Sequence, residues 1–182
     1  MRSFAQRADC QVWDEPFYAW YLAATGLDHP MRETVIAAGE AEDWQAVMRD
    51  CTETPLPDGA TVHYQKHMTH HMLPEISLDW LGSVANVFLI RRPEAVLASY
   101  HDRRADPEMA DVGFDRQAEI FDRVAEMTGS PPPVLDSDKV LTDPESAMKK
   151  LCKAVGIAFD PAMLSWPPGR RESDGAWAPH WY

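Results

Sequence analysis

The sequence predicts an α/β protein in which a mostly parallel sheet is flanked by helices. Short apolar runs alternate along the chain with stretches of helical periodicity, which is the pattern of strand–helix–strand units. The run over residues 84–90 is almost entirely apolar, as expected for a strand that is buried on both faces. With 182 residues, the chain has the length of one packed domain, and we expect residues 1–182 to form one.

Composition narrows the class of protein and its partners. A hydrophobic fraction of 45% and seven Trp indicate a packed, globular chain. The net charge of −12 argues against nucleic acid and membrane surfaces as partners, because both attract basic faces. The three Cys are widely spaced and form no CxxC motif, so neither disulfides nor a thiolate metal site are expected. No signal peptide and no apolar run of about 20 residues is visible, and we expect a cytoplasmic protein.

The first half of the chain contains two predicted strands and two predicted helices. A short strand is expected over residues 11–13, followed by a helix over residues 14–24 that Gly26 ends. A second helix is predicted over residues 32–49, and Gly39 is its weakest position. Residues 61–66 follow a Pro-Asp-Gly turn and are rich in β-formers, so they are expected to be a strand.

The second half begins with the apolar strand over residues 84–90. Pro93 suits the first turn of a following helix, where its missing N–H does no harm. A further helix is predicted over residues 114–127, then a short strand at 134–135 and a helix from residue 143 to Gly156. The expected core-facing residues of the helix over 114–127 are Ala118, Phe121, Val124 and Ala125. The stretch from Trp166 has little periodicity and is expected to be irregular.

An anion site is predicted where the apolar strand ends. Arg91 follows that strand and would lie at the carboxyl edge of the sheet, where open α/β sheets bind ligands. Arg92 and the start of the next helix add positive charge and unpaired N–H groups, and Ser99 adds a hydroxyl within that helix. Arg103 and Arg104 extend the basic cluster. The pattern alone also fits ordinary surface charges at a sheet edge, and both interpretations stay open at this point.

The segment from Ile90 to Tyr100 resembles a motif of sulfotransferases. These enzymes bind the 3′-phosphate of 3′-phosphoadenosine 5′-phosphosulfate with a strand followed by Arg-x-Pro and, at the spacing found here, Ser-Tyr. The resemblance implies that Arg91, Ser99 and Arg92 bind this co-substrate. It also implies the P-loop NTPase-like fold of sulfotransferases. Residue 92 is more often Asp or Asn in that family, so Arg92 departs from the motif while adding positive charge.

Further segments carry the same resemblance, which covers about residues 10–165. Residues 134–145 with 151–156 are similar to a strand, an Asp-Pro-Glu turn and a helix that ends at Gly in the family. Lys66-His67 with Leu73-Pro74 resembles the stretch that carries the family's catalytic His, although the first Pro of that stretch is absent. Residues 14–18 match the Asp-Glu-Pro-Phe-Tyr start of small bacterial sulfotransferase-like proteins.

Four of the seven His lie close together, at positions 63, 67, 70 and 71. The resemblance implies that His67 is the base that takes a proton from the acceptor, a role that suits a pKa near neutral. It implies that Lys66 offsets charge on the transferring group. A metal site is an alternative, because His63, His67 and His71 would share one face of a helix. The β-forming character of residues 61–65 argues against that helix, and no metal is expected. His70 and His71 are expected to be half-buried loop side chains.

Other conspicuous side chains have structural explanations. Asp14 and Glu15 precede a predicted helix, where acidic residues favour the helix dipole, so we expect a structural or substrate-orienting role for them. Trp20, Tyr21 and Trp44 occur at helical spacings and are expected in the core.

The resemblance also sets an expectation for the two ends. The family fold starts with a strand and a P-loop that holds the 5′-phosphosulfate, and no residues before Gln11 match that element. We therefore expect a sheet that lacks the first strand and the P-loop, and a chain without the family's C-terminal nucleotide-closing segment. An unpaired strand edge favours association, which leaves a homo-oligomer open.

These observations lead to one main functional expectation. By resemblance, the chain transfers a sulfuryl group from 3′-phosphoadenosine 5′-phosphosulfate to a small-molecule acceptor hydroxyl or amine, without a metal. A non-catalytic nucleotide-binding or interaction module on the same fold is the alternative. A phosphotransferase or nucleotide hydrolase would need a Walker A motif and Mg²⁺ ligands, and neither is visible.

Overall fold

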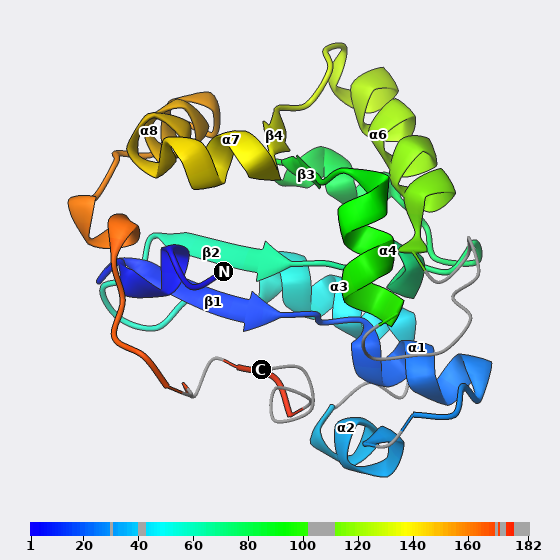
Figure 1. The fold of residues 1–182 in the computed structure, drawn as a ribbon. Coiled ribbons are helices and arrows are strands. Elements are labelled where there is room, and N and C mark those ends of the chain that lie inside the picture. The colour runs from blue at the N-terminus through cyan, green and yellow to red at the C-terminus, as the bar shows by residue number, and fades with distance from the viewer. Residues whose placement is uncertain (30, 40–42, 102–111, 170, 172–173, 177–182) are drawn as a thin grey trace. The chain divides into compact units, whose positions relative to one another are not determined.

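The fold is α/β, with parallel strands flanked by helices, as predicted (Figure 1). The structure is a computed structural model that describes residues 1–29, 31–39, 43–101, 112–169, 171 and 174–176. Arg103 and Arg104 of the predicted basic cluster lie outside the described residues. The elements, in chain order, are η1 (Phe4–Gln6), β1 (Cys10–Asp14), α1 (Tyr18–Thr25), α2 (Arg32–Ala38), α3 (Trp44–Glu53), β2 (Val62–Lys66), η2 (Thr69–His71), η3 (Asp79–Ser83), β3 (Phe88–Ile90), α4 (Pro93–His101), α6 (Phe114–Thr128), β4 (Val134–Asp136), α7 (Ser137–Thr142), α8 (Pro144–Ala154) and η4 (Pro161–Leu164).

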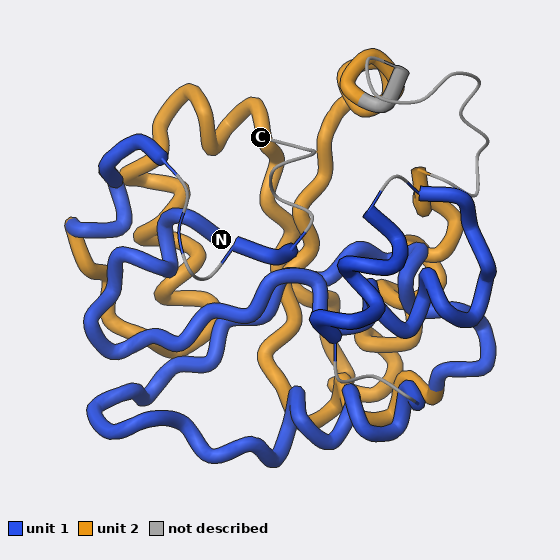
Figure 2. Tube along the Cα trace, turned by 90° about the horizontal axis from the view of Figure 1, so that it is seen from below, with its two compact units in different colours: residues 1–76, 162–182 blue, residues 77–161 orange. Residues whose placement is uncertain are grey.

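The chain divides into two compact units, which Figure 2 draws in different colours. Unit 1 comprises residues 1–76 and 162–182, so both ends of the chain belong to it, and unit 2 comprises residues 77–161. Each unit contains one pair of parallel strands, β1–β2 in unit 1 and β3–β4 in unit 2. A single domain over residues 1–182 therefore stays a prediction.

In unit 1, β1 and β2 run parallel and are paired from Cys10 opposite Val62 to Asp14 opposite Lys66 (Figure 1). Both strands confirm the sequence prediction for this part of the chain. Parallel strands need a long crossover, and here it contains α1, α2 and α3. The register brings the end of β1 next to the end of β2, and this juxtaposition builds the site described below.

The core of unit 1 forms where α1 packs against α2. Tyr18, Ala19, Leu22 and Val35 make up a buried cluster, and Leu22 is completely buried. The helix α1 begins at Tyr18, four residues later than predicted, and it ends at Gly26 as predicted. Gly26 has a φ of 64°, which glycine adopts without the steric cost that a Cβ imposes. Trp20 is buried, in agreement with its predicted place in the core.

The single helix predicted over residues 32–49 is wrong, because the structure has two helices there. The first, α2, ends at Ala38, and Gly39 is extended. Gly39 lies so close to Ala19 that a Cβ at position 39 would overlap the Ala19 side chain. The second, α3, starts after Asp43, whose side-chain Oδ1 accepts a hydrogen bond from the Ala46 N–H at 2.6 Å. A close helix contact at one end and an N-cap at the other thus separate the two helices.

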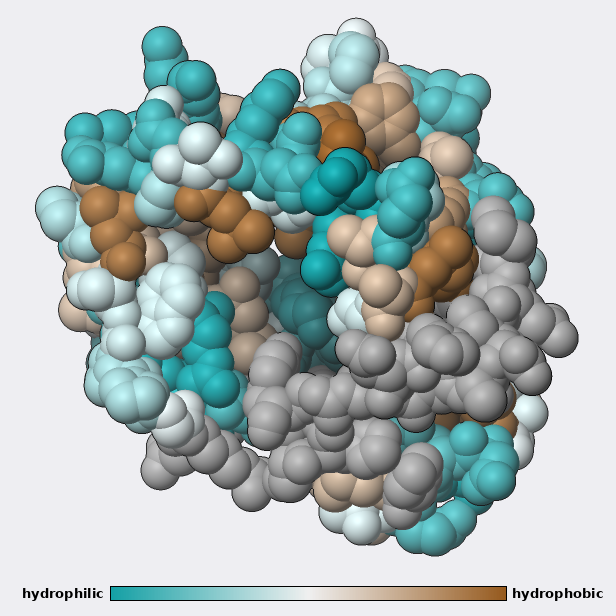
Figure 3. Space-filling model, viewed as in Figure 1, coloured by the Kyte–Doolittle hydropathy of each residue, from teal (hydrophilic) through white to brown (hydrophobic). Residues whose placement is uncertain are grey.

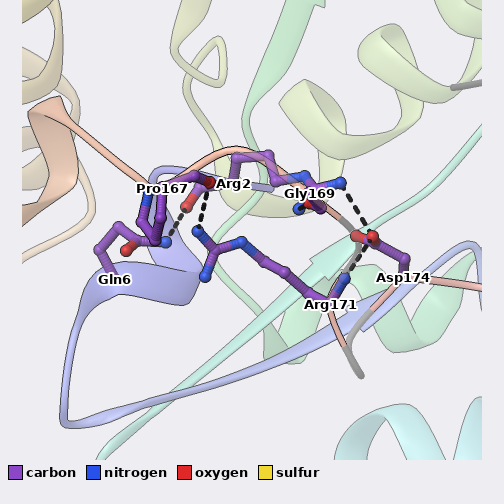
Figure 4. A network of polar contacts seen from close by, with 6 residues as sticks. All are labelled: Arg2, Gln6, Pro167, Gly169, Arg171 and Asp174. Atoms are coloured by element: carbon purple, nitrogen blue, oxygen red, sulfur yellow. Dashed lines mark hydrogen bonds and ion pairs between the residues drawn. The ribbon is translucent and has the colours of Figure 1, made fainter.

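A polar network connects the two ends of the chain within unit 1 (Figure 4). The Arg2 guanidinium donates to Asp174 Oδ2 at 2.8 Å and to the Gly169 carbonyl at 3.1 Å. Asp174 is buried and also accepts a hydrogen bond from the Arg171 backbone N–H. The Arg171 side chain donates to the Pro167 carbonyl at 3.2 Å. Hydrogen bonds thus connect Gly169 and Asp174 to the start of the chain, and the described residues from Trp166 onward form no helix or strand, as predicted.

In unit 2, β3 pairs in parallel with β4, from Phe88 opposite Val134 to Ile90 opposite Asp136. The strand β3 has three residues and is shorter than the predicted strand over 84–90. The expectation of burial on both faces is wrong for Leu89 and Ile90, which are 58% and 45% exposed, because a two-stranded sheet covers little of either strand. Figure 3 shows hydrophobic residues at the surface around α4 and α7.

The helices α4, α6 and α8 of unit 2 were predicted from the sequence, whereas α7 was not. The helix α6 buries Ile120 and Val124, while Ala118 of the predicted apolar face is exposed. Phe121 packs edge-on against Phe88, with ring centroids 5.2 Å apart. The helix α8 starts after Asp143, which caps it by accepting a hydrogen bond from the backbone N–H of residue 146 at 3.1 Å.

No helix within the described ranges combines the length and the apolar character that crossing a membrane requires.

Candidate functional site

The predicted site residues are divided between the two units. Lys66 and His67 belong to unit 1, at the end of β2, whereas Arg91, Arg92 and Ser99 belong to unit 2, after β3.

Lys66 lies between two acidic side chains at the ends of β1 and β2. Its Nζ is 3.3 Å from Asp14 Oδ1 and donates a hydrogen bond to Glu15 Oε1. The Asp14 side chain is 1% exposed, so it is a buried carboxylate placed opposite Lys66 by the strand register. The sequence interpretation assigned these two carboxylates to a helix start, but the structure pairs them with Lys66. Much of the positive charge of Lys66 is therefore offset before any ligand binds.

Glu15 occupies an unusual backbone position next to this pair. Its φ is 54°, in the left-handed region that residues with a Cβ seldom adopt. Its N–H donates to the Lys66 carbonyl at 2.8 Å, and its own carbonyl accepts from the Tyr18 N–H at 2.9 Å. Burial raises the pKa of the Glu15 carboxyl, and this effect outweighs the lowering by Lys66. The turn between β1 and α1 thus holds Glu15 against Lys66.

His67 is half-buried and follows β2 directly. Its Nε2 is 3.1 Å from Gln65 Oε1, and its ring packs against Phe17 with centroids 5.7 Å apart. Burial, with smaller contributions from His63 and Lys66, lowers the pKa of His67 to about 3. The expectation of a near-neutral pKa is therefore wrong for the isolated protein. The imidazole is neutral at physiological pH, so it has a lone pair to accept a proton, but it is a weak base.

The other His side chains of the cluster pack against aromatic rings. His71 is buried and stacks on Tyr18, with centroids 4.4 Å apart and planes at 4°, and its second neighbour is Tyr21 at 4.8 Å. His70 meets Tyr21 edge-on at 5.7 Å. Burial lowers the pKa of His71 well below its usual range. These contacts favour a structural role for His70 and His71, as predicted, although the role is ring packing and His71 is more deeply buried than expected.

The helix that a histidine metal site would require does not form. His63 lies in β2, and His71 lies in the short helix η2. Within the described ranges, no group of three or more His, Cys, Asp or Glu side chains is arranged to hold a metal ion.

A cavity of about 540 Å³ lies in unit 1 beside β1. Its volume is within the range of small-molecule sites. Its lining includes Asp14, Glu15 and His63, so it reaches the carboxylates that hold Lys66. Asp50 and Asp174 also contribute to the wall. The side chains around the end of β1 therefore border a space of the size of a small-molecule site.

In unit 2, Arg91 and Arg92 connect β3 directly to α4, as predicted. Both side chains are exposed, and Arg92 forms an ion pair with Asp138 at 2.9 Å. The Arg92 carbonyl accepts from the N–H groups of residues 95 and 96, so Arg92 starts the helix. Arg91 forms no ion pair or hydrogen bond with any other described residue. Among the described residues, none therefore competes with an anion for its guanidinium.

Ser99 is exposed and lies six residues beyond Pro93 in α4. That separation corresponds to a rise of ~9 Å along the helix axis. The hydroxyl therefore lies on the flank of α4 and not at its N-terminus, so an anion bound to both Arg91 and Ser99 would lie along the helix. This finding refines the predicted site, in which the first N–H groups of the helix and Ser99 were expected to act together.

Sequence reasoning missed Gln65, which contacts both His63 and His67. Strand alternation over the predicted strand at 61–66 was the available signal, because residues 63, 65 and 67 then share one face. The pairing of Asp14 and Glu15 with Lys66 could not be found in this way, because it depends on the register between β1 and β2.

These features define a class of protein, namely an α/β domain that presents an Arg after one parallel strand and a Lys-His pair at the end of another. The family model for the sulfotransferase domain matches residues 1–182, and the chain belongs to that family. Two proteins of Arabidopsis thaliana, branched-chain-amino-acid aminotransferase-like proteins 1 and 2, are 34% and 32% identical over 182 residues. The match covers all of this chain and 32% of each relative, so the chain spans about a third of their length. No solved structure matches the chain.

Proposed function

We propose that this domain binds 3′-phosphoadenosine 5′-phosphosulfate and transfers its sulfuryl group to the hydroxyl or amine of a small acceptor. The observation that carries the proposal is the Arg91–Ser99 segment, which keeps the family's spacing and follows a parallel strand in a chain that belongs to the sulfotransferase-domain family. The names of the two relatives describe whole proteins of about three times this length, and they add no aminotransferase activity to the proposal.

The donor nucleotide would be held at its 3′-phosphate by unit 2. Arg91 offers a guanidinium that no described residue neutralises, and the exposed Ser99 hydroxyl can donate a hydrogen bond. Arg92 adds charge, but its ion pair with Asp138 must weaken or shift before it can bind phosphate fully. We therefore assign the largest share of phosphate binding to Arg91.

The transfer step would use the residues at the end of β2. When bound, the nucleotide supplies a sulfuryl group whose S–O bond to the 5′-phosphate can break. The acceptor oxygen or nitrogen forms a new bond to sulfur, and adenosine 3′,5′-bisphosphate leaves with the electron pair. His67 takes the acceptor proton, and Lys66 offsets the growing negative charge.

A titration of adenosine 3′,5′-bisphosphate tests the donor site. Calorimetry should detect binding to the wild type, and Arg91→Ala should raise Kd by ~10–100-fold, because a charge-assisted hydrogen bond contributes about 1.5–3 kcal/mol. Arg123→Ala is the matched control, since Arg123 is an exposed Arg of the same unit that pairs with Asp79. No binding to the wild type, or equal losses in both variants, would refute the proposed site.

A non-catalytic nucleotide-binding module is the second candidate. It is favoured by the low pKa of His67, about 3, and by the two carboxylates that already offset the charge of Lys66. A sulfuryl-transfer assay with a panel of small phenols and amines separates the two candidates. Binding of the bisphosphate together with no transfer to any acceptor of the panel supports the module, whereas transfer that depends on His67 supports the enzyme.

A further inference from the structure

Gln65 connects two His side chains with the end of a helix in unit 1. It lies on β2 between His63 and His67, on the face that these alternate residues share. Its Nε2 is 2.6 Å from the Cys51 carbonyl and 3.1 Å from His63 Nδ1. Its Oε1 is 3.1 Å from His67 Nε2. One amide thus makes three hydrogen bonds, and each has a donor and an acceptor that can be assigned.

The Cys51 carbonyl fixes which end of the Gln65 amide is the nitrogen. A carbonyl only accepts hydrogen bonds, so the Gln65 atom that contacts it must be the NH₂ group. This carbonyl needs a donor from outside its helix, because it lies in the last turn of α3 and the residue four positions later is Pro55, which has no N–H. The amide therefore has one stable orientation, with its oxygen toward His67.

The orientation of the amide determines the proton positions on both rings. The second N–H of Gln65 donates to His63 Nδ1, so that nitrogen carries no proton. Gln65 Oε1 can only accept, so the His67 Nε2 must carry the proton of the neutral ring. The remaining nitrogen of His67, Nδ1, then has the lone pair.

We propose that Gln65 is a positioning residue that holds neutral His67 as the Nε2–H tautomer, so that the lone pair of the ring stays on Nδ1, which is buried. This inference rests on the proposed function for the identity of the reaction, but the tautomer itself does not depend on any activity. Gln65 touches neither substrate nor reacting atoms in this scheme, and it acts through His67. Because a fixed ring needs no reorganisation at the moment of transfer, the arrangement favours the reaction.

Nuclear magnetic resonance of protein labelled with ¹⁵N-histidine tests the tautomer directly. The wild type at neutral pH should show His67 with a protonated Nε2 and an unprotonated Nδ1, assigned by loss of the signals in His67→Ala. Gln65→Leu removes every hydrogen bond of the amide at similar volume, and the His67 signals should shift toward a mixture of tautomers. His71 is the internal control, since its neighbours are Tyr18 and Tyr21 and its signals should stay unchanged.

Gln65→Glu separates the two ends of the amide. A carboxylate still accepts from His67 Nε2 but no longer donates to His63 or to the Cys51 carbonyl, so the His67 tautomer should persist while the His63 signals move. Circular dichroism confirms that each variant is folded. A wild-type His67 that carries its proton on Nδ1 overturns the proposal even if no variant folds. A folded Gln65→Leu with unchanged His67 signals also overturns it.

Kinetics connect the tautomer to catalysis. If His67 is the base, Gln65→Leu should lower kcat by ~10–100-fold with a small change in the Kd for adenosine 3′,5′-bisphosphate. Gln65→Glu should have a substantially higher kcat than Gln65→Leu, because its carboxylate still accepts the hydrogen bond from His67 Nε2. If transfer is unaffected by His67→Ala, the proposed role of His67 fails while the tautomer measurement still stands. If transfer requires His67 but not Gln65, the positioning role fails and the proposed function remains.

Discussion

The two groups of site residues differ in how completely their contacts are formed. Lys66 and His67 in unit 1 have partners within hydrogen-bond or ion-pair distance, and the carboxylate opposite Lys66 is buried. In unit 2, the Arg91 and Ser99 side chains are exposed and form no hydrogen bond with any other described residue. Buried polar groups must be paired in the folded protein, whereas exposed ones can remain solvated until a ligand replaces water. The first region is thus organised by folding, and the second depends on an anion.

This difference predicts that substitutions in the first region change both stability and turnover. Substitutions in the second region should change affinity with little effect on stability.

Removal of the imidazole at position 67 should have the largest effect. We expect His67→Ala to lower kcat for sulfuryl transfer by ~10²–10⁴-fold, the usual contribution of a general base. The Kd for adenosine 3′,5′-bisphosphate should stay within about twofold, because the proposed phosphate ligands lie in unit 2. His70→Ala is the control, since His70 packs on Tyr21 and has no proposed part in transfer. Unchanged turnover in His67→Ala would remove His67 from the mechanism.

The pH dependence of stability should report the burial of His67. Its pKa is about 3 in the folded protein and 6.5 for an accessible His, so the unfolded chain binds more protons between these values. Stability should therefore fall as pH decreases from 6.5 toward 3, by a few kcal/mol at most. His67→Gln should flatten this dependence in urea unfolding measured at several pH values. Equal slopes for the two proteins would contradict the prediction.

Two other kinds of group affect the same pH range and stay in both proteins. Burial also lowers the pKa of His63 and His71, so both contribute in the same direction as His67. Burial raises the pKa of Glu15, so the folded state holds that proton more tightly and stability falls as pH rises above the usual value of 4.5. The difference between wild type and His67→Gln isolates the contribution of His67 from that of these other groups.

Much of the fold could be predicted from the sequence because its signals are local. The strands at β1, β2 and β4, the Gly26 helix end and the Asp143 cap each depend on a few neighbouring residues. The break at Gly39 was missed because it depends on contact with Ala19 of another helix. The exposure of Leu89 was missed because apolar composition predicts a buried strand and does not reveal how many neighbours the strand will have.

Only the site residues that belong to a sequence motif could be predicted. The spacing from Arg91 to Ser99 and the Lys66-His67 pair can be read directly from the sequence. The low pKa of His67 could not be predicted, since it results from burial that only the packed chain produces. The same is true of the carboxylates next to Lys66, which the strand register brings there.

The buried and exposed ion pairs should differ in their contribution to stability. Asp14→Ala removes a fully buried partner of Lys66, and we expect it to lower the free energy of unfolding by about 1–3 kcal/mol, less than for a completely buried pair because Lys66 is 30% exposed. Arg92→Ala breaks the exposed pair with Asp138 and should change the free energy of unfolding by less than ~0.5 kcal/mol. Urea unfolding of both variants measures the contrast, and equal losses would contradict it.

Ser99→Ala should produce the smallest effect, confined to affinity. The hydroxyl is exposed and can contribute one neutral donor to a charged phosphate, so its loss should raise the Kd for adenosine 3′,5′-bisphosphate by ~2–10-fold. Stability should not fall, because Ala is the better helix former in α4. Ser146→Ala in α8 is a control for the same change in another helix of unit 2. Since Ser99 lies on the flank of α4, an equal Kd for wild type and Ser99→Ala would place the bound phosphate at the start of the helix, with Arg91 alone as its side-chain ligand.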